Sequence, residues 1–249
     1  MSPSCNQEMA LQAQGLWFAY RERDWILKDV SLSVPSGQIT IIMGPWGSGK
    51  TSLLKILAGI LKPCRGHVEI LDYNMTLQPR RSLASFIGYI PQQLGLVRNL
   101  TALENALMGA LGRCGNSTVL LGLFPRGEMK KAAEALDLMG IAHKSNEKVF
   151  RLRGGERQRV AIARTLLQHP RVVVADEFVS DLDMALALEI LSRIRRAAAQ
   201  EQITFVMSMH RQGLVREFAE NVVTLREGHI APGFIPALSQ GAAAVEMLQ

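Results

Sequence analysis

The chain has 249 residues, a length that suits one large α/β domain or a core domain with a smaller lobe. Hydrophobic residues make up 48% of it, which allows a sizeable buried core and excludes a disordered composition. The formal net charge of +6 permits nucleic acid, nucleotide phosphates or an anionic membrane face as partners, but the basic residues are scattered and select none of them.

The cysteines and the apolar segments indicate the class of protein. Cys5, Cys64 and Cys114 lie far apart and form no CxxC pair, which favours reduced thiols in a cytosolic protein without a zinc site. The N-terminal segment lacks the basic start and apolar stretch of a signal peptide. No run of about 18 apolar residues is present, so the sequence predicts no membrane-spanning segment.

The first third of the chain has the patterns of strands. Residues 30–34 alternate between apolar and polar, which predicts a half-buried strand, and a turn is expected at Pro35–Gly37. The uniformly apolar run Ile39–Met43 is typical of a strand covered on both faces. Another strand is predicted at His67–Leu71, after a loop at Pro63–Gly66.

The middle of the chain has a helical composition. Residues 94–149 are rich in Leu, Ala, Met, Glu and Lys, which predicts a helical lobe with a helix near Met129–Met139. The segment Arg113–Glu128 is typical of a loop or irregular insertion. A further helix is predicted from Gly155 to about His169, directly before Pro170.

The last third of the chain again has the patterns of strands. Two apolar strands are predicted at Val172–Ala175 and Ile203–Ser208. A terminal pair of strands is expected around the turn Arg226–Gly228. The tail after about Pro236 is rich in Ala and Gly, and we expect it to be loosely held.

Residues 44–51, GPWGSGKT, match G-x-x-x-x-G-K-[ST] at every fixed position between a predicted strand and a predicted helix. The glycines let phosphate oxygens approach backbone N–H groups at the start of the helix, which form an anion-binding nest. Lys50 is expected to reach the β- and γ-phosphates, and the Thr51 hydroxyl to coordinate Mg²⁺. Trp46 occupies a variable position, and its ring is expected to lie outward. The residues expected to contact the nucleotide are Gly44, Pro45, Trp46, Gly47, Ser48, Gly49, Lys50, Thr51 and Ser52.

The stretch VVVADEF supplies the acids that a phosphate loop needs. The apolar strand ends in Asp176, which we expect to bind Mg²⁺ through water, and Glu177 is the candidate general base. The alternative is a pair of solvated acids at a strand end. The fully apolar strand and the independent match of residues 44–51 favour the functional interpretation.

The segment LRGGERQRVAIARTLLQHP lies between these two motifs. Together with GPWGSGKT and VVVADEF it resembles the ATP-binding subunits of ABC transporters, over residues 11 to about 231. The resemblance implies an α/β fold with a RecA-like P-loop NTPase core, an antiparallel β subdomain and an inserted helical subdomain. In this single ATPase domain the core is expected at 1–93 and 165–235, the helical subdomain at about 94–164, and the tail at 236–249.

Four single residues match the family in the correct order. Gln92 is similar to the Q-loop glutamine, which contributes to catalysis and to Mg²⁺ binding, and Asp183 to the acid of the D-loop. His210 is similar to the switch histidine, and Tyr20 lies where the family places an aromatic ring against adenine. Any one of these residues alone has an ordinary structural explanation, so the prediction depends on their order.

The resemblance also implies a mechanism. Two copies of the chain would pack head to tail around two ATP molecules, with Arg153, Gly154 and Gly155 of the signature facing the γ-phosphate on the other copy. Hydrolysis, with Glu177 orienting water and His210 contacting the γ-phosphate, would then separate the copies.

Three residues depart from the family pattern: Arg153 replaces the signature serine, Glu156 its glutamine, and Phe178 the proline after Asp-Glu. With these replacements we expect an active ATPase that hydrolyses ATP slowly.

The segments LTALENALMGALGR and LLGLFPRGE are similar to ATPases of phosphonate and phosphite importers. We therefore expect a motor for import of such oxyanions, on the cytoplasmic side of the inner membrane, with permease subunits and indirectly a solute-binding protein as partners. An exporter-type ATPase and a nucleic-acid-linked ABC ATPase are the alternatives. Against the latter, the chain has one cassette and no long coiled coil, so nucleic acid is not expected as a partner.

Overall fold

The computed structural model describes residues 8–21, 24–71, 73–74, 85–114, 124–231 and 235–236. The chain divides into two compact units, one formed by Met1–Leu83 with Ala197–Gln249 and the other by Ala84–Arg196. Most of the irregular insertion predicted at 113–128, and nearly all of the tail at 236–249, lies outside the described residues.

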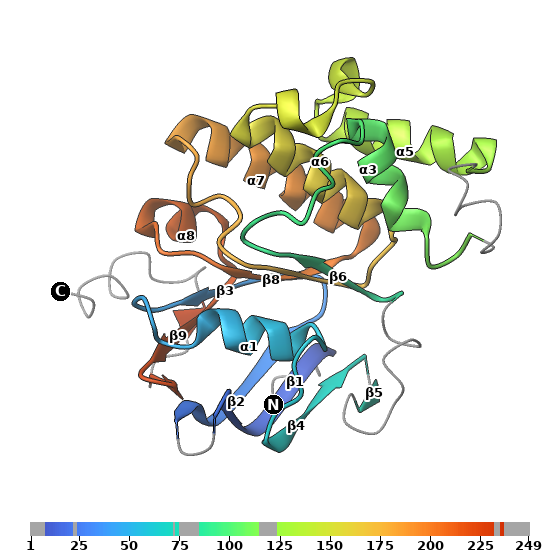
Figure 1. Cartoon of the computed structure of the whole chain (residues 1–249). Helices are drawn as coiled ribbons and strands as arrows, with labels where there is room; N and C mark the ends of the chain where they lie inside the picture. The colour runs from blue at the N-terminus through green and yellow to red at the C-terminus, as the bar shows by residue number, and fades with distance from the viewer. Residues whose placement is uncertain are drawn as a thin grey trace, which may run out of the picture. The chain divides into compact units, whose positions relative to one another are not determined.

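The first unit contains an antiparallel sheet in the order β2-β1-β4-β5 (Figure 1). Leu16 and Phe18 are buried on one face of this sheet, while Trp17 between them is half-buried on the other. The strand predicted at 30–34 is confirmed as part of β2, whereas β1 was not predicted because register shifts around Gly15 interrupt its alternation. The bounds are β1 Met9–Ala19, β2 Trp25–Pro35, β4 Arg65–Ile70 and β5 Tyr73–Asn74.

The same unit contains parallel strands. The strand β3 (Ile39–Met43) lies between β8 (Thr204–Ser208) and β9 (Asn221–Arg226) and runs parallel to both. Every residue of β3 and β8 is buried, as their apolar runs predict. The helix α1 contacts β8 as well as β1 and β2, so it ties the parallel strands to the antiparallel sheet (Figure 1). The remaining elements are α1 Lys50–Leu57, α8 Gln212–Phe218, β10 His229–Ile230 and β11 Ile235–Pro236.

The second unit combines two parallel strands with packed helices. The strand β6 (Ile87–Ile90) runs parallel to β7 (Val172–Ala175), and helices α3, α5 and α6 contact one another pairwise. The predicted helical subdomain at about 94–164 falls within this unit, and its boundaries remain a prediction. None of the helices in the described residues is long and apolar enough to cross a membrane. The helices are α3 Ala102–Leu107, η1 Met108–Ala110, α5 Arg126–Leu138, η2 Ala142–Lys144, η3 Val149–Arg151, α6 Gly154–Leu167 and α7 Met184–Glu201, of which the last five residues belong to the first unit.

Local sequence sets the start of α3. The Glu104 N–H donates to the Thr101 hydroxyl at 3.1 Å, and the Thr101 N–H donates to the Glu104 carboxylate at 2.7 Å, which forms a capping box. The backbone hydrogen bond from Thr101 lowers the pKa of Glu104 below its usual value. Residues 101–104 alone therefore fix where this helix begins.

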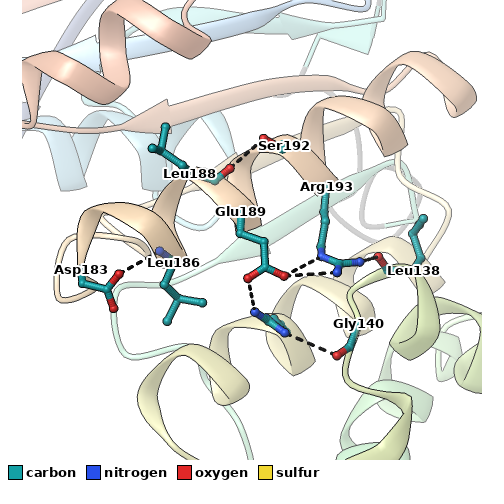
Figure 2. A network of polar contacts seen from close by, with 9 residues as sticks. Leu138, Gly140, Asp183, Leu186, Leu188, Glu189, Ser192 and Arg193 are labelled. Carbon is teal, nitrogen blue, oxygen red and sulfur yellow. Dashed lines mark hydrogen bonds and ion pairs between the residues drawn. The ribbon is translucent and has the colours of Figure 1, made fainter.

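An ion-pair network joins three helices of the second unit (Figure 2). Glu189 on α7 accepts from Arg159 on α6 at 2.7 Å and from Arg193, one turn along α7, at 3.2 Å. The Arg193 guanidinium also donates to the Leu138 carbonyl at the end of α5, at 2.9 Å. The Arg159 side chain is only 14% exposed, so Glu189 neutralises a largely desolvated charge.

This network predicts that substitutions of two glutamates differ in their effect on the stability of the protein. Glu189→Ala should lower the free energy of unfolding by about 2 kcal/mol, because it leaves the Arg159 charge without its counter-ion. Glu134→Ala removes an exposed pair with Lys130 on α5 and should change it by less than about 0.5 kcal/mol. Urea unfolding of both variants measures the difference, and equal losses would contradict the importance of the network.

Candidate functional site

The loop between β3 and α1 has the backbone of a phosphate cradle. Gly44, Gly47 and Gly49 have φ values of 149°, 78° and 101°, a region that side-chain-bearing residues rarely adopt. A Cβ at Gly44 would overlap the Leu225 carbonyl oxygen, and one at Gly49 would lie 2.9 Å from Leu27 Cδ2. Space as well as conformation therefore requires glycine at positions 44 and 49, whereas conformation alone requires it at 47.

Lys50 is buried inside the curve of this loop, with 5% of its surface exposed. Its Nζ donates to the carbonyl oxygens of Gly44 and Pro45, at 2.9 and 3.0 Å. These bonds hold the ammonium group against the loop backbone, where it can also neutralise a bound anion.

The first turn of α1 leaves backbone donors for such an anion. Gly49 provides the N-cap without a side-chain hydrogen bond, and the first turn contains no acidic residue. The N–H groups at the start of a helix have no partner within the helix and carry partial positive charge. Thr51, which also lies in this turn, has an exposed side chain that carries a hydroxyl group. Phosphate can therefore be bound by backbone N–H groups together with Lys50.

Backbone hydrogen bonds from strands distant in the sequence hold the loop. The Gly228 N–H, in the turn between β9 and β10, donates to the Ser48 carbonyl at 3.2 Å, and the Lys28 N–H of β2 donates to the Gly228 carbonyl at 2.8 Å. The Ser48 hydroxyl is buried and has no hydrogen-bond partner among the described residues. The sequence shows Gly228 only as a turn residue, so this supporting contact could not be predicted.

Two predicted residues of the first unit lie beside the loop. Tyr20 is 59% exposed, packs edge to face on Phe18 at 4.9 Å, and has its hydroxyl 3.5 Å from the Ser52 hydroxyl in the first turn of α1. Its ring therefore has an open surface next to the loop. Trp46 is 84% exposed and lies outward, as expected, so it does not fill the cradle.

His210 lies at the same edge of the parallel strands. The loop leaves β3 at its carboxyl end, and Met209 after β8 donates its N–H to the Ile42 carbonyl at 3.3 Å. His210 follows directly and is exposed. The first unit thus places the phosphate loop and His210 at one edge of its parallel strands, with Tyr20 beside the loop.

The second unit gathers the acidic residues and Gln92. Asp176 is 2% exposed at the end of β7, and its N–H donates to the Ile90 carbonyl of β6 at 2.9 Å. Glu177 has φ 40°, an uncommon value outside glycine, and its side chain is half-buried. Gln92 is exposed in the turn after β6. Because β6 and β7 are parallel, all three residues lie at one edge of this strand pair.

The signature segment forms the start of α6. Glu156 accepts a 2.8 Å hydrogen bond from the Arg153 N–H, so it caps the helix from its first turn. The Arg153 side chain is exposed. A Cβ at Gly155 would overlap Leu186 of α7, whereas a Cβ at Gly154 would meet nothing within 4 Å. Packing within the unit explains Gly155 but not Gly154.

Asp183 has a structural role in this chain. Its carboxylate accepts a 2.9 Å hydrogen bond from the Leu186 N–H in the first turn of α7 (Figure 2). The predicted D-loop acid is therefore the N-cap of α7, and its side chain is exposed.

Comparison with known proteins identifies the family. The model of the ABC transporter family matches residues 27–180. The chain belongs to the ABC transporter family. Phosphonates import ATP-binding protein PhnC of Escherichia coli (strain UTI89 / UPEC) is 35% identical over 212 residues, which cover 82% of this chain and 81% of that protein. PhnC 1 of Haloquadratum walsbyi is 35% identical over 204 residues, covering 82% of this chain and 66% of that protein.

Solved ABC cassettes have the same fold. A dimeric post-hydrolysis structure of the ATP-binding cassette MJ0796 with ADP and Pi has a TM-score of 0.80 and 28% identity, and covers 91% of this chain and 98% of its own. The structure of cbiO1 from Clostridium perfringens, part of the complex cbiONQ, has a TM-score of 0.81 and 25% identity, with 93% and 90% covered. The chain is thus an ABC ATPase with a P-loop NTPase core.

Two departures from the family pattern have a structural explanation in this ABC ATPase. Glu156 uses its carboxylate oxygen as a cap acceptor, a role that suits the positive end of a helix. Phe178 is 1% exposed and fills the core behind the acidic pair. For Arg153, no contact of its side chain with the described residues explains why the serine is replaced.

The two signature glycines predict different stability effects. Gly155→Ala should be less stable than Gly154→Ala by about 1 kcal/mol, because its methyl group would displace the end of the half-buried Leu186 side chain, whereas the space beside Gly154 is open. Both variants gain the preference of alanine for a helix, so the comparison isolates the packing. Urea unfolding compares them, and equal effects would contradict this account of the packing.

Proposed function

We propose that this ABC ATPase binds and hydrolyses ATP to power an importer for phosphonate or phosphite-like oxyanions, and that two copies associate head to tail when ATP is bound. The observation that carries the proposal is the cradle in which Lys50 is buried against Gly44 and Pro45 at the start of α1. The adenine would stack on the open ring of Tyr20, and the phosphates would lie on residues 44–52.

The proposed Mg²⁺ ligands are Thr51 in the first unit, with Gln92 and Asp176 in the second. Their oxygen donors suit Mg²⁺, which proteins commonly hold by one or two carboxylates together with substrate phosphates. Within the described residues no cluster of three or more His, Cys, Asp or Glu could hold a metal alone. This fits an ion that enters with the nucleotide. Bound Mg²⁺ would neutralise charge on the phosphates.

The proposed chemistry uses Glu177 as the general base and His210 as a contact of the γ-phosphate. Support for Glu177 comes from its position directly after buried Asp176, in a left-handed conformation that local sequence alone would not favour. Gln92 at the same strand edge would help to place the metal and the attacking water.

The proposed dimer would bring Arg153, Gly154 and Gly155 of one copy to the γ-phosphate bound by the other. Gly154 supports this arrangement, because it is exposed with open space beside it and has no packing reason to be glycine. The similar cassette MJ0796 has been solved as a dimer with ADP and Pi. The Asp183 carboxylate, which caps α7, would lie at the same interface.

Glu177→Gln tests the catalytic assignment. The variant should bind ATP, hydrolyse it about 100- to 10,000-fold more slowly because the base is lost, and accumulate as an ATP-bound dimer. Phosphate release and size-exclusion chromatography with ATP measure these effects, with Glu134→Gln on α5 as the control that should behave as wild type. Phosphate release that is undiminished in Glu177→Gln would remove this residue from the role of base.

The solute is proposed from relatives such as the Escherichia coli protein, which is named a phosphonates import ATP-binding protein and is 35% identical. The partners would be integral permease subunits and, through them, a solute-binding protein, with this chain held peripherally on the cytoplasmic side of the inner membrane. Vesicles are prepared with the permease in the membrane, this chain and ATP inside, and the solute-binding protein outside. They should take up phosphonate or phosphite from outside. Transport of an unrelated solute alone would contradict the proposed substrate, and outward transport would contradict import.

A further inference from the structure

Arg164, near the end of α6, contacts the turn that contains Gln92. Its two terminal nitrogens donate to consecutive carbonyls, to Leu94 at 2.8 Å and to Gly95 at 2.6 Å. The side chain is half-buried, and burial lowers the pKa of the guanidinium below its ordinary value. No carboxylate of the described residues pairs with it, so its polar contacts in this part of the chain are the two carbonyls of the turn.

The turn adopts a conformation that its sequence does not favour. Leu94 has φ 62° and Gly95 has φ 60°. The left-handed region is natural for glycine but strained for leucine, so other contacts must hold it. Within the turn, the Leu94 N–H donates to the Pro91 carbonyl and the Gly95 N–H to the Gln93 carbonyl, both at 2.8 Å. The charged fork of Arg164 fixes the carbonyls of both left-handed residues.

The rest of the turn is also fixed to the helices. The Asn105 side chain on α3 accepts from the Val97 N–H at 2.8 Å and donates to its carbonyl at 3.0 Å, and α3 packs on α6. On the other side, Gln168 after α6 donates to the Ile87 carbonyl of β6 at 3.0 Å. Gln92 thus lies on a short segment whose two ends are both connected to α6 or its neighbour, and Arg164 holds the middle.

We propose that Arg164, on the helix that begins at the signature glycines, is a positioning residue for Gln92, because it holds the two carbonyls that follow this glutamine in the turn. Lysine does not reproduce this contact, because it has one nitrogen in place of the two arginine nitrogens that each donate to one carbonyl. The inference rests on the proposed function, in which Gln92 binds Mg²⁺.

Arg193 offers a matched control. It is also a half-buried arginine of the second unit that donates to a backbone carbonyl, Leu138, at 2.9 Å, but it does not contact the Gln92 turn. Arg164→Lys and Arg193→Lys thus each change an arginine contact with a backbone carbonyl at a different place, and Arg193→Lys in addition changes the ion pair with Glu189. A purely structural role predicts similar consequences for both variants, whereas the positioning role predicts a change in metal dependence for Arg164→Lys alone.

The experiment measures ATP hydrolysis by the full chain as a function of Mg²⁺ concentration, and ATP binding without Mg²⁺. Arg164→Lys should raise the Mg²⁺ concentration for half-maximal activity about tenfold, a usual effect of losing a residue that orients a metal ligand. Its ATP affinity without Mg²⁺ should match that of wild type. Arg193→Lys should change neither quantity. In a Gln92→Ala background, Arg164→Lys should cause no further change, because its effect acts through Gln92.

The inference is overturned if Arg164→Lys and Arg193→Lys have the same Mg²⁺ dependence, or if the effect of Arg164→Lys persists undiminished with Gln92→Ala. If Arg164→Lys does not fold, Arg164→Gln, which can still donate to one carbonyl, is measured in its place with the same expected results. A folded wild-type chain without Mg²⁺-dependent hydrolysis would instead overturn the proposed function, which separates the two failures.

Discussion

A phosphate loop depends on the close approach of phosphate to an uncovered backbone. Such an approach needs successive N–H groups without side chains in front of them, at the start of a helix, with a cation held nearby. In this chain Gly44 and Gly49 cannot carry a side chain, because their backbone is left-handed and their neighbours occupy the space. Lys50 is buried against the same backbone, so the positive charge is in place within the loop itself.

The rest of the first unit keeps this loop in position. The strand β3 is buried on both faces between two parallel neighbours, and α1 is packed against strands of both sheets. The turn at Gly228 fixes the Ser48 carbonyl from behind. A loop held on three sides needs little reorganisation when it binds an anion, which is why its rigidity favours affinity. In the second unit, Arg164 and Asn105 give the Gln92 turn a comparable support.

The sequence predicts those parts whose information is local. The strand Ile39–Met43, the phosphate loop and the strand Val172–Ala175 were predicted because an unbroken apolar run and the spacing of glycines are visible within a few residues. The strand β1 was missed because its register shifts disturb the alternation. The contacts of Gly228 and Arg164 could not be predicted, since they join residues far apart in the chain. The role of Glu177 follows from its position after an apolar strand and the match of residues 44–51, those of Gln92 and His210 follow from the family resemblance, and all three remain predictions.

Calorimetric titration of the full chain with ATP and Mg²⁺ tests the central claim most directly. Wild type and Lys55→Met, which changes a lysine in the last turn of α1, should bind equally well. Lys50→Met should bind about 10- to 100-fold more weakly, because a charged hydrogen-bond donor to the phosphates is lost. Absence of binding heat with folded wild type, or equal affinity in Lys50→Met, would contradict the account.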